Sequence, residues 1–197
     1  RGRYFGIHMF NPPYNMTLCE LITTKYSDRN LTEELKQYLD TVLLRTVVEV
    51  KDSPAFLGNR IGFQFINEAM QYAEKYADNG GIDFIDSILG GFTGRSMAPL
   101  TTADFIGLDV HKAIVDNIYD KTNDYAHETF MLPSFCQKLI DMGLLGRKSG
   151  RGFYHLLRLE DGSKKMTVYD VATDSYRDQI NYSFPFVEKM VQDIQEG

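Results

Sequence analysis

The stretch "TVVEVKDSPAFLGNRIGFQFINEAMQYA", residues 46–73, contains the change of pattern that decides the fold. Residues 46–52 are rich in valine and predict a β-strand. Ser53 followed by Pro54 is a helix start signal, a capping residue with proline in the first turn. Apolar residues then recur at helical spacing to about Tyr76. We therefore expect a helix over 54–76 and a change at residue 53 from an α/β pattern to a helical one.

Upstream of residue 46 the chain predicts the edge of an α/β sheet. Strands are expected at 4–10 ("YFGIHMF") and 18–23 ("LCELIT"), followed by a helix over about 29–44 that Ser27 or Asp28 can cap. Pro12 and Pro13 end the first strand, because proline donates no hydrogen bond to a sheet. Three short strands cannot bury both faces of a sheet, so this sheet is expected to be incomplete.

Downstream of residue 76 the pattern is mainly helical, with glycines between the segments. Helices are expected at about 82–89, 98–106, 108–121 and 133–142. Alternating residues on either side of Asp161-Gly162 predict a β-hairpin, and residues 184–197 predict an amphipathic helix. The expected fold is mainly α, with domains at 1–52, 53–154 and 155–197.

Composition and charge exclude several classes of function. The 197 residues are 43% hydrophobic and 24% charged, as in an ordinary globular protein. A net charge of −6 argues against a nucleic-acid surface and against an anionic membrane. The two cysteines lack metal-site or disulfide spacing, which fits a reducing compartment, and no run is long enough to span a bilayer. We expect a cytoplasmic domain cut from a longer polypeptide, because "RGRYFG" starts without Met.

Glu20 and His8 are the first candidates for chemistry. In the 18–23 strand Glu20 has apolar neighbours on both faces, so its carboxylate is expected to be at least half buried and to need a partner. His8 can supply one if two strand ends meet across a loop. A carboxylate on imidazole Nδ1–H fixes the tautomer and frees Nε2 as a base. The alternative is a histidine that merely packs and a glutamate that never meets it.

Asn59 is the third candidate. On the expected 54–76 helix it shares a face with Phe56, Phe63 and Ile66, so its amide points toward packing. A buried amide must find partners, and its NH2 group could donate to a ligand carbonyl. The alternative is that Asn59 ties down the backbone of a neighbouring loop.

The basic loop at 147–151 ("RKSGR") could hold a phosphate, although exposed charges of this kind are more often solvated. His111, His127 and His155 lack the spacing of metal ligands and are given no role. Neither a GxGxxG nor a GxxxxGK[ST] motif occurs, so no cofactor loop is expected within these residues.

Four blocks in a fixed order resemble the (S)-3-hydroxyacyl-CoA dehydrogenase family over about residues 1–154. They are "FGIHMFNPPYNMTLCELI" (5–22), "VVEVKDSPAFLGNRIGFQFINEA" (47–69), "MAPLTTADFIGLD" (97–109) and "GLLGRKSGRGFY" (143–154). The resemblance implies that 1–52 is the end of an NAD-binding Rossmann domain. It also implies that 53–154 is a dimer-forming helical domain, similar to the C-terminal domain of 6-phosphogluconate dehydrogenase.

The resemblance implies a role for each candidate. His8 matches the catalytic histidine, Glu20 its carboxylate partner and Asn59 the asparagine that contacts substrate, while Asn11 would fix the strand end and help bind substrate. The implied reaction oxidises (S)-3-hydroxyacyl-CoA to 3-oxoacyl-CoA with NAD, in fatty-acid β-oxidation or butyrate-type lipid metabolism. Because the glycine-rich NAD loop would lie upstream of residue 1, the isolated chain is expected to be inactive.

The chain differs from the family pattern at two positions, and residues 155–197 extend beyond the four matching blocks. The third block has Met97-Ala98-Pro99 where the family has Met-Gly-Pro, and Gly58 replaces a bulkier residue. Both changes could alter acyl-chain preference. Residues 155–197 are similar to the continuation in long, fused bacterial β-oxidation proteins.

Two other functions stay open. One is a related two-domain dehydrogenase that acts on a hydroxy acid or sugar acid. The other is a non-catalytic dimerisation module, because apolar helices such as "ADFIGLDVHKAIVDNIY" could pair with a partner.

Overall fold

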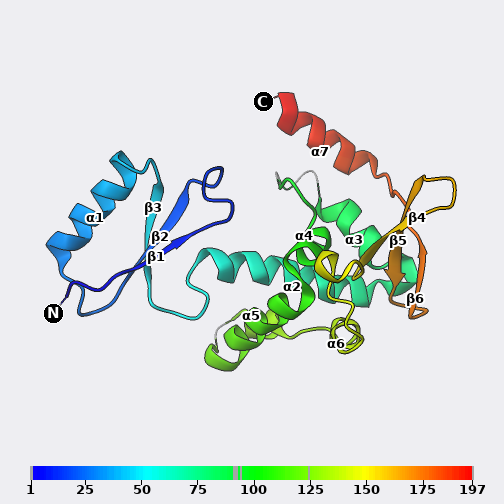
Figure 1. The fold of residues 1–197 in the computed structure, drawn as a ribbon, viewed down its shortest axis with the longest axis horizontal. Helices are drawn as coiled ribbons and strands as arrows, with labels where there is room; N and C mark the ends of the chain where they lie inside the picture. Colours follow the sequence, from blue (N-terminus) through cyan, green and yellow to red (C-terminus); the bar gives the residue numbers. More distant parts are fainter. Residues whose placement is uncertain (1, 91–92, 94, 124, 197) are drawn as a thin grey trace. The chain divides into compact units, whose positions relative to one another are not determined.

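The computed structural model describes the chain except residues 1, 91–92, 94, 124 and 197, and of Gln195 it describes the backbone alone. The chain divides into two compact units, residues 1–62 and 63–197, and the boundary falls within one helix, α2. The fold is mostly helical, with a three-stranded sheet in each unit. Figure 1 follows the chain from the first sheet, in blue and cyan, to the C-terminal helix in red.

The first unit is built on a sheet with the order β1-β2-β3. β1 (Gly6–Met9) runs antiparallel to β2 (Leu18–Thr23), and β2 runs parallel to β3 (Thr46–Lys51). The parallel pair needs a crossover, which α1 (Arg29–Thr41) provides. Asp28 caps this helix by accepting the backbone N–H groups of Asn30 and Leu31. The sequence had predicted each of these elements to within a few residues.

The two faces of this sheet have different environments because side chains alternate along a strand. On one face, Cys19 and Leu21 of β2 form a small core with Leu39 of α1. On the other face, Glu20 lies opposite His8 in the antiparallel register. The same alternation that buries the apolar residues under α1 therefore places the histidine and the glutamate together on the opposite face.

The helix α2 (Gly58–Lys75) begins four residues later than expected. The Ser53-Pro54 start signal does not start the helix, because Ala55 and Phe56 adopt left-handed backbone conformations with φ of 60° and 55°. A right-handed helix cannot include such residues. The expectation that Phe56 shares a helical face with Asn59 was therefore wrong.

The second unit contains the rest of α2 and four further helices before its sheet. These are α3 (Ile82–Leu89), α4 (Pro99–Ile106), α5 (Leu108–Lys121) and α6 (Ser134–Asp141), with 3-10 turns at Ala77–Asn79, His127–Phe130 and Arg147–Ser149. The predicted bounds of α3 and α5 are confirmed. The core includes Ile66, Ala69, Met70, Ala73, Ile82, Leu100, Leu108, Leu139, Phe153 and Val168.

The C-terminal β-structure is a three-stranded antiparallel sheet, and the expectation of a simple hairpin was incomplete. β4 (Tyr154–Arg158) pairs with β5 (Lys164–Asp170), as expected, and β5 also pairs with β6 (Ser175–Asp178). The sequence of β6 is too short and polar to show an alternating pattern. Arg177 instead fixes it, by donating to both carboxylate oxygens of Asp83 at 2.7 and 2.8 Å and to the carbonyl of Gly80. The helix α7 (Pro185–Glu196) follows.

Replacing Asp83 with alanine is expected to destabilise the second unit by about 3 kcal/mol. The change removes the bidentate partner of the partly buried Arg177 guanidinium, which keeps a longer contact of 3.5 Å with Asp170, and it removes the acceptor of the Ile180 N–H. Urea unfolding followed by circular dichroism measures the loss. Asp178→Ala is the matched control, because it breaks only an exposed pair with Lys165 and should change the unfolding free energy by less than about 1 kcal/mol. Equal effects of the two variants would contradict the structural role of Asp83.

Candidate active site

His8 and Glu20 form a hydrogen-bonded pair within the first unit. The Nδ1 atom of His8 lies 2.7 Å from Oε2 of Glu20. Glu20 is almost completely buried, with 1% of its surface exposed, whereas the His8 side chain is 27% exposed. The carboxylate can only accept, so a neutral imidazole carries its proton on Nδ1. The other ring nitrogen, Nε2, is then an unprotonated base.

The second oxygen of Glu20 is held by the start of α2. Its Oε1 atom accepts the backbone N–H groups of Leu57 and Gly58, at 2.9 and 2.7 Å. These are among the first N–H groups of a helix, which have no partner within the helix, and the helix dipole favours a negative charge there. Glu20 is thus a buried carboxyl group with three hydrogen bonds, which fix its orientation.

The imidazole of His8 lies against two phenylalanine rings. The ring centroid of Phe10 is 4.6 Å from that of His8, and the centroid of Phe56 is 5.6 Å away. Among the residues that the structure describes, none hydrogen-bonds to Nε2 of His8. The arrangement can therefore take a proton from a bound hydroxyl group and stabilise the resulting imidazolium with Glu20.

Each of the two asparagines lies near one member of this pair, Asn11 in sequence to His8 and Asn59 next to the Gly58 contact with Glu20. Asn59 occupies the first turn of α2, one residue after the Gly58 N–H that bonds Glu20, and it is half-buried. Asn11 is exposed and precedes Pro12 through a cis peptide bond, in the loop after β1. Arg45 holds this loop by donating to the carbonyls of Pro13 and Met16. Within the described residues, neither asparagine side chain has a hydrogen-bond partner, so the interpretation that Asn59 ties down a loop has no support.

The three cationic side chains of the basic loop at 147–151 all make contacts within the second unit. Lys148 pairs with Asp109, the Arg147 guanidinium lies 5.5 Å from the ring centre of Phe105, and that of Arg151 lies 5.4 Å from the ring centre of Tyr176. These internal contacts favour a structural role over phosphate binding. The structure does not support the loop as an anion site.

His111 is a buried structural histidine on α5. Its Nε2 atom donates to Oδ1 of Asn67, whose NH2 group donates to the carbonyls of Thr129 and Met131. Nδ1 of His111 has no partner in the described structure. Burial lowers the pKa of His111 to about 3, so the ring is neutral at physiological pH.

His111 is expected to make the second unit less stable as the pH falls. The pKa of His111 is about 3 in the folded state and its ordinary value is 6.5, so below pH 6.5 the unfolded chain binds a proton that the folded chain does not bind. Stability is lost by about 1.4 kcal/mol per pH unit between those values. Asp104 acts in the opposite direction below pH 6, because burial raises its pKa to about 6.

The contribution of His111 is isolated by comparison with His111→Gln, which keeps an N–H donor for Asn67. Urea unfolding at pH 7, 6, 5 and 4 should show the wild type losing stability relative to the variant by about 2–3 kcal/mol between pH 6 and 4. Parallel curves for the two proteins would contradict this assignment.

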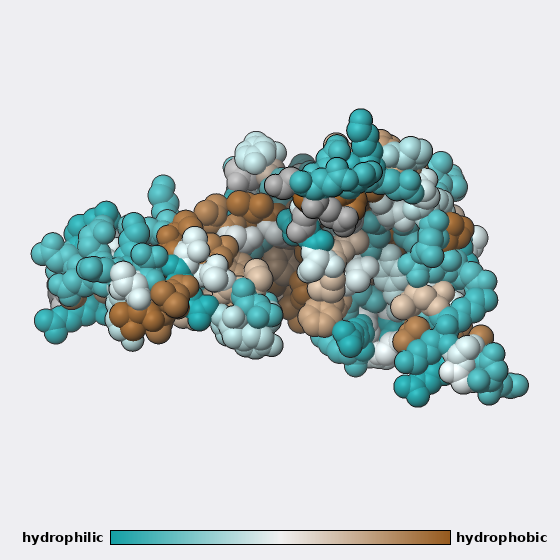
Figure 2. All heavy atoms as spheres, turned by 90° about the horizontal axis from the view of Figure 1, so that it is seen from above, coloured by the Kyte–Doolittle hydropathy of each residue, from teal (hydrophilic) through white to brown (hydrophobic). Residues whose placement is uncertain are grey.

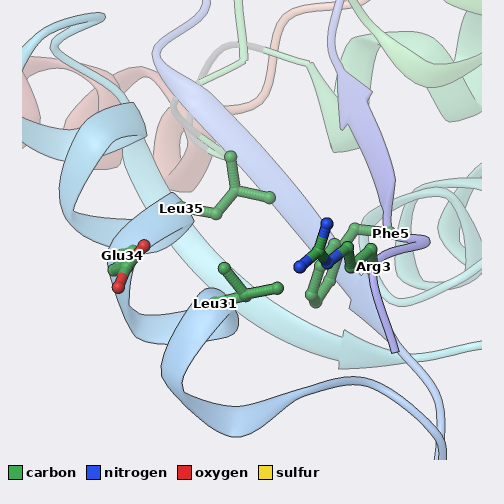
Figure 3. A pocket seen from close by; sticks show the side chains of 5 residues that line it. All are labelled: Arg3, Phe5, Leu31, Glu34 and Leu35. Carbon is green, nitrogen blue, oxygen red and sulfur yellow. The ribbon is translucent and has the colours of Figure 1, made fainter. Parts of the chain in front are cut away.

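Two other surface features do not belong to the site. Figure 3 shows a hollow between the residues that lead into β1 and the helix α1, lined by Arg3, Phe5, Leu31, Glu34 and Leu35. Phe5 and Leu35 pack on the Cys19 core, on the face of the sheet opposite His8. Ile61 of α2 is 58% exposed. Figure 2 shows that hydrophobic residues (brown) gather in patches among hydrophilic ones on one face of the molecule.

The described residues form no metal site and no membrane-spanning helix. No group of three or more His, Cys, Asp and Glu side chains there could hold a metal ion. None of the described helices is long and apolar enough to cross a bilayer. Cys19 and Cys136 are both free and buried.

Comparison with known proteins identifies the family. Residues 56–156 match the C-terminal domain of 3-hydroxyacyl-CoA dehydrogenase, and residues 1–53 match the NAD-binding domain of the same enzymes. The chain belongs to the 3-hydroxyacyl-CoA dehydrogenase family. The family has an NAD-binding domain and acts on acyl-CoA substrates.

Individual relatives agree with this. A probable 3-hydroxyacyl-CoA dehydrogenase from Bacillus subtilis is 31% identical over 195 residues, which are 98% of this chain and 24% of the relative. One from Deinococcus radiodurans is 37% identical over 153 residues, 77% of this chain and 43% of the relative. The crystal structure of (S)-3-hydroxybutyryl-CoA dehydrogenase from Ralstonia eutropha superposes with a TM-score of 0.66 at 31% identity, over 77% of this chain and 51% of that one. The chain thus spans about half or less of the length of these relatives.

The residues present do not fit NAD by themselves. The sequence has no glycine-rich turn between a strand and a helix of the kind that cradles a pyrophosphate. In the first unit, the N-terminus of α2 is already occupied by the Glu20 carboxylate and that of α1 by the Asp28 side chain. The described residues provide a base and its orienting acid, and they provide no dinucleotide cradle.

The sequence did not predict three features of the site. They are the backbone N–H groups of Leu57 and Gly58, and the ring of Phe56 against His8. The sequence carries no signal for the first two, because every residue except proline has an N–H group. The third depends on the left-handed turn at Ala55 and Phe56, and neither residue is of a type that favours such a turn.

Proposed function

We propose that this chain supplies the general base for the oxidation of (S)-3-hydroxyacyl-CoA to 3-oxoacyl-CoA, with NAD as the oxidant. The observation that carries the proposal is the His8–Glu20 pair, with its second carboxylate oxygen fixed by the start of α2. Family membership supports the substrate class, since the relatives are 3-hydroxyacyl-CoA and 3-hydroxybutyryl-CoA dehydrogenases.

The proton in this reaction goes to His8. Its Nε2 atom takes the proton of the C3 hydroxyl group as the carbon–oxygen double bond forms, and C3 loses its hydrogen as hydride. Glu20 stabilises the imidazolium through Nδ1–H. A complete NAD-binding domain would hold the nicotinamide that supplies the hydride acceptor. Because only the transition state carries the developing charge, the pair acts mainly on turnover.

Asn59 is proposed to position the oxygen at C3, and Asn11 to fix the end of β1. The half-buried Asn59 amide has no hydrogen-bond partner among the described side chains and stands in the first turn of α2, next to the Glu20 contacts. It can therefore donate to a substrate oxygen without breaking an internal bond.

A fusion enzyme tests the proposed function. In it, the portion of the Ralstonia 3-hydroxybutyryl-CoA dehydrogenase that precedes the matched region is joined to residues 1–197, which restores a complete NAD-binding domain. NAD binding is first verified by fluorescence. We expect oxidation of (S)-3-hydroxybutyryl-CoA and no oxidation of free 3-hydroxybutyrate or sugar acids. A fusion enzyme that binds NAD and oxidises only the free acids would overturn the proposal in favour of a related hydroxy-acid dehydrogenase.

Self-association is proposed for the helical unit. Phe105, Val110, Met131 and Met142 are large apolar side chains exposed on this unit, and exposed apolar surface of this kind favours a protein partner. We expect the chain to sediment as a dimer in analytical ultracentrifugation. A strict monomer at high concentration would contradict the expected dimer and leave the catalytic proposal in place.

A further inference from the structure

The His8 imidazole lies against two aromatic rings that come from different segments. Phe10 lies just beyond the end of β1, two residues after His8, and Phe56 belongs to the turn before α2. Both rings are tilted against the imidazole, with interplanar angles of 56° and 47°. Neither ring has a polar group, so both act on His8 through ring contacts and not by pairing with its nitrogens.

The turn that carries Phe56 is strained. Ala55 and Phe56 are consecutive residues with left-handed φ, a conformation that costs a non-glycine residue about 1–3 kcal/mol. Such strain persists only where the surroundings hold it. Here the next two N–H groups, of Leu57 and Gly58, bond Glu20, and the Phe56 ring contacts His8. The contacts of this turn with both His8 and Glu20 therefore offset its backbone strain.

The position of the Phe10 ring depends on the glycine at position 58. A Cβ atom at Gly58 would lie 2.5 Å from Cζ of Phe10, closer than non-bonded atoms approach. The absence of a side chain at Gly58 is what allows the Phe10 ring to lie over the start of α2.

We propose that Phe10 and Phe56 are positioning residues, which together clamp the His8 imidazole with Nδ1 on Glu20 and Nε2 available to the substrate. We call these two residues the His8 clamp. The inference rests on the proposed function, because it describes how the same base is oriented.

The clamp matters because the imidazole has an alternative orientation. Rotation about the terminal side-chain bond of histidine is broad and roughly twofold, so a flipped ring is accessible unless packing prevents it. A flipped ring takes Nδ1 away from Glu20 and leaves its tautomer undetermined. The two rings restrict rotation about that bond.

NMR of the 15N-histidine-labelled 197-residue chain tests the clamp without catalytic activity. The chain has four histidines, so the ring signals of His8 can be assigned with a His8→Gln variant. In the wild type we expect one His8 species, with the proton on Nδ1. In Phe56→Leu and Phe10→Leu, which stay apolar but lose a ring, we expect a mixture of both tautomers with at least about 20% of the minor form.

Phe5→Leu is the matched control. Phe5 lies just before β1 and packs on the Cys19 core, on the face opposite His8. The change should lower the stability of the first unit to a degree comparable with the clamp variants and leave the His8 tautomer unchanged. Where a clamp variant fails to fold, Gly58→Ala displaces the Phe10 ring without removing it and should give the same mixture of tautomers.

The clamp proposal is overturned if Phe56→Leu and Phe10→Leu fold and both retain a single Nδ1–H species. The proposal is also overturned if Phe5→Leu gives as much of the minor tautomer as Phe56→Leu and Phe10→Leu do. These outcomes concern the orientation of His8 and differ from a failure of the proposed function, which would appear as a fusion enzyme whose turnover does not depend on His8.

Discussion

Replacing His8 with glutamine is expected to lower the turnover of the fusion enzyme by about 10²–10⁴-fold, the range that general-base catalysis contributes. Glutamine is similar in length and its amide can still donate to the Glu20 carboxylate, so the buried charge keeps a partner. It has no basic nitrogen, however, and the proton of the C3 hydroxyl group then has no acceptor on the protein.

The Michaelis constant separates this effect from a loss of binding. Because His8 acts as a base only as the transition state forms, KM for (S)-3-hydroxybutyryl-CoA should stay within about threefold of the unsubstituted fusion enzyme. His155→Gln makes the same chemical change in the second unit, where the His155 ring lies against Tyr176, and should leave turnover unchanged. A His8→Gln enzyme with near-normal turnover would refute the assignment of His8 as the base.

Replacing Glu20 with glutamine is expected to reverse the tautomer of His8. The two N–H groups of Leu57 and Gly58 require an acceptor, so the amide oxygen must take the position of Oε1. The NH2 group then faces Nδ1 of His8 and can only donate to it. A neutral imidazole would therefore carry its proton on Nε2, where the substrate needs a base.

The effect of Glu20→Gln on turnover is expected to be large although the shape of the site is kept. The corresponding change of acid to amide in a serine-protease triad lowers kcat by about 10⁴-fold through the wrong tautomer, and we expect a loss of about 10³–10⁴-fold here. The ring 15N shifts of His8 in the labelled chain should show Nε2–H as the main form.

Glu49→Gln is the matched control for this change. Glu49 lies on β3, the strand next to β2, and its carboxylate accepts hydrogen bonds from Thr23 and Arg29 at the surface. The variant should retain both turnover and the Nδ1–H tautomer of His8. Retention of Nδ1–H in Glu20→Gln itself would show that Glu20 does not set the tautomer.

Much of the secondary structure could be predicted from periodicity alone. The strand at 18–23 and the helices at 82–89 and 108–121 have the predicted bounds, because each buries one clear apolar face or run. The errors fall where a distant contact overrides the local signal. Ser53-Pro54 predicts a helix start, and the left-handed turn at Ala55 and Phe56 delays it to Gly58. β6 has no pattern of its own and depends on the ion pair between Arg177 and Asp83.

In the candidate site, too, some features follow from the local sequence and others depend on distant contacts. The sequence by itself indicated which residue types form the site. A glutamate with apolar neighbours on both strand faces is expected to be buried, and a buried carboxylate must find a partner. It also placed His8 two residues before the Asn-Pro turn that ends the strand. These local facts were enough to name His8 and Glu20 as a pair, and they left open whether the two would meet.

Only the tertiary structure decided that they meet, and how. The antiparallel register sets His8 opposite Glu20, and the start of α2 supplies two N–H groups to the second carboxylate oxygen. Register and helix approach depend on contacts between residues up to 38 positions apart. No local pattern encodes those contacts, since backbone N–H groups are the same in almost every residue, and only the folded chain gives them a direction.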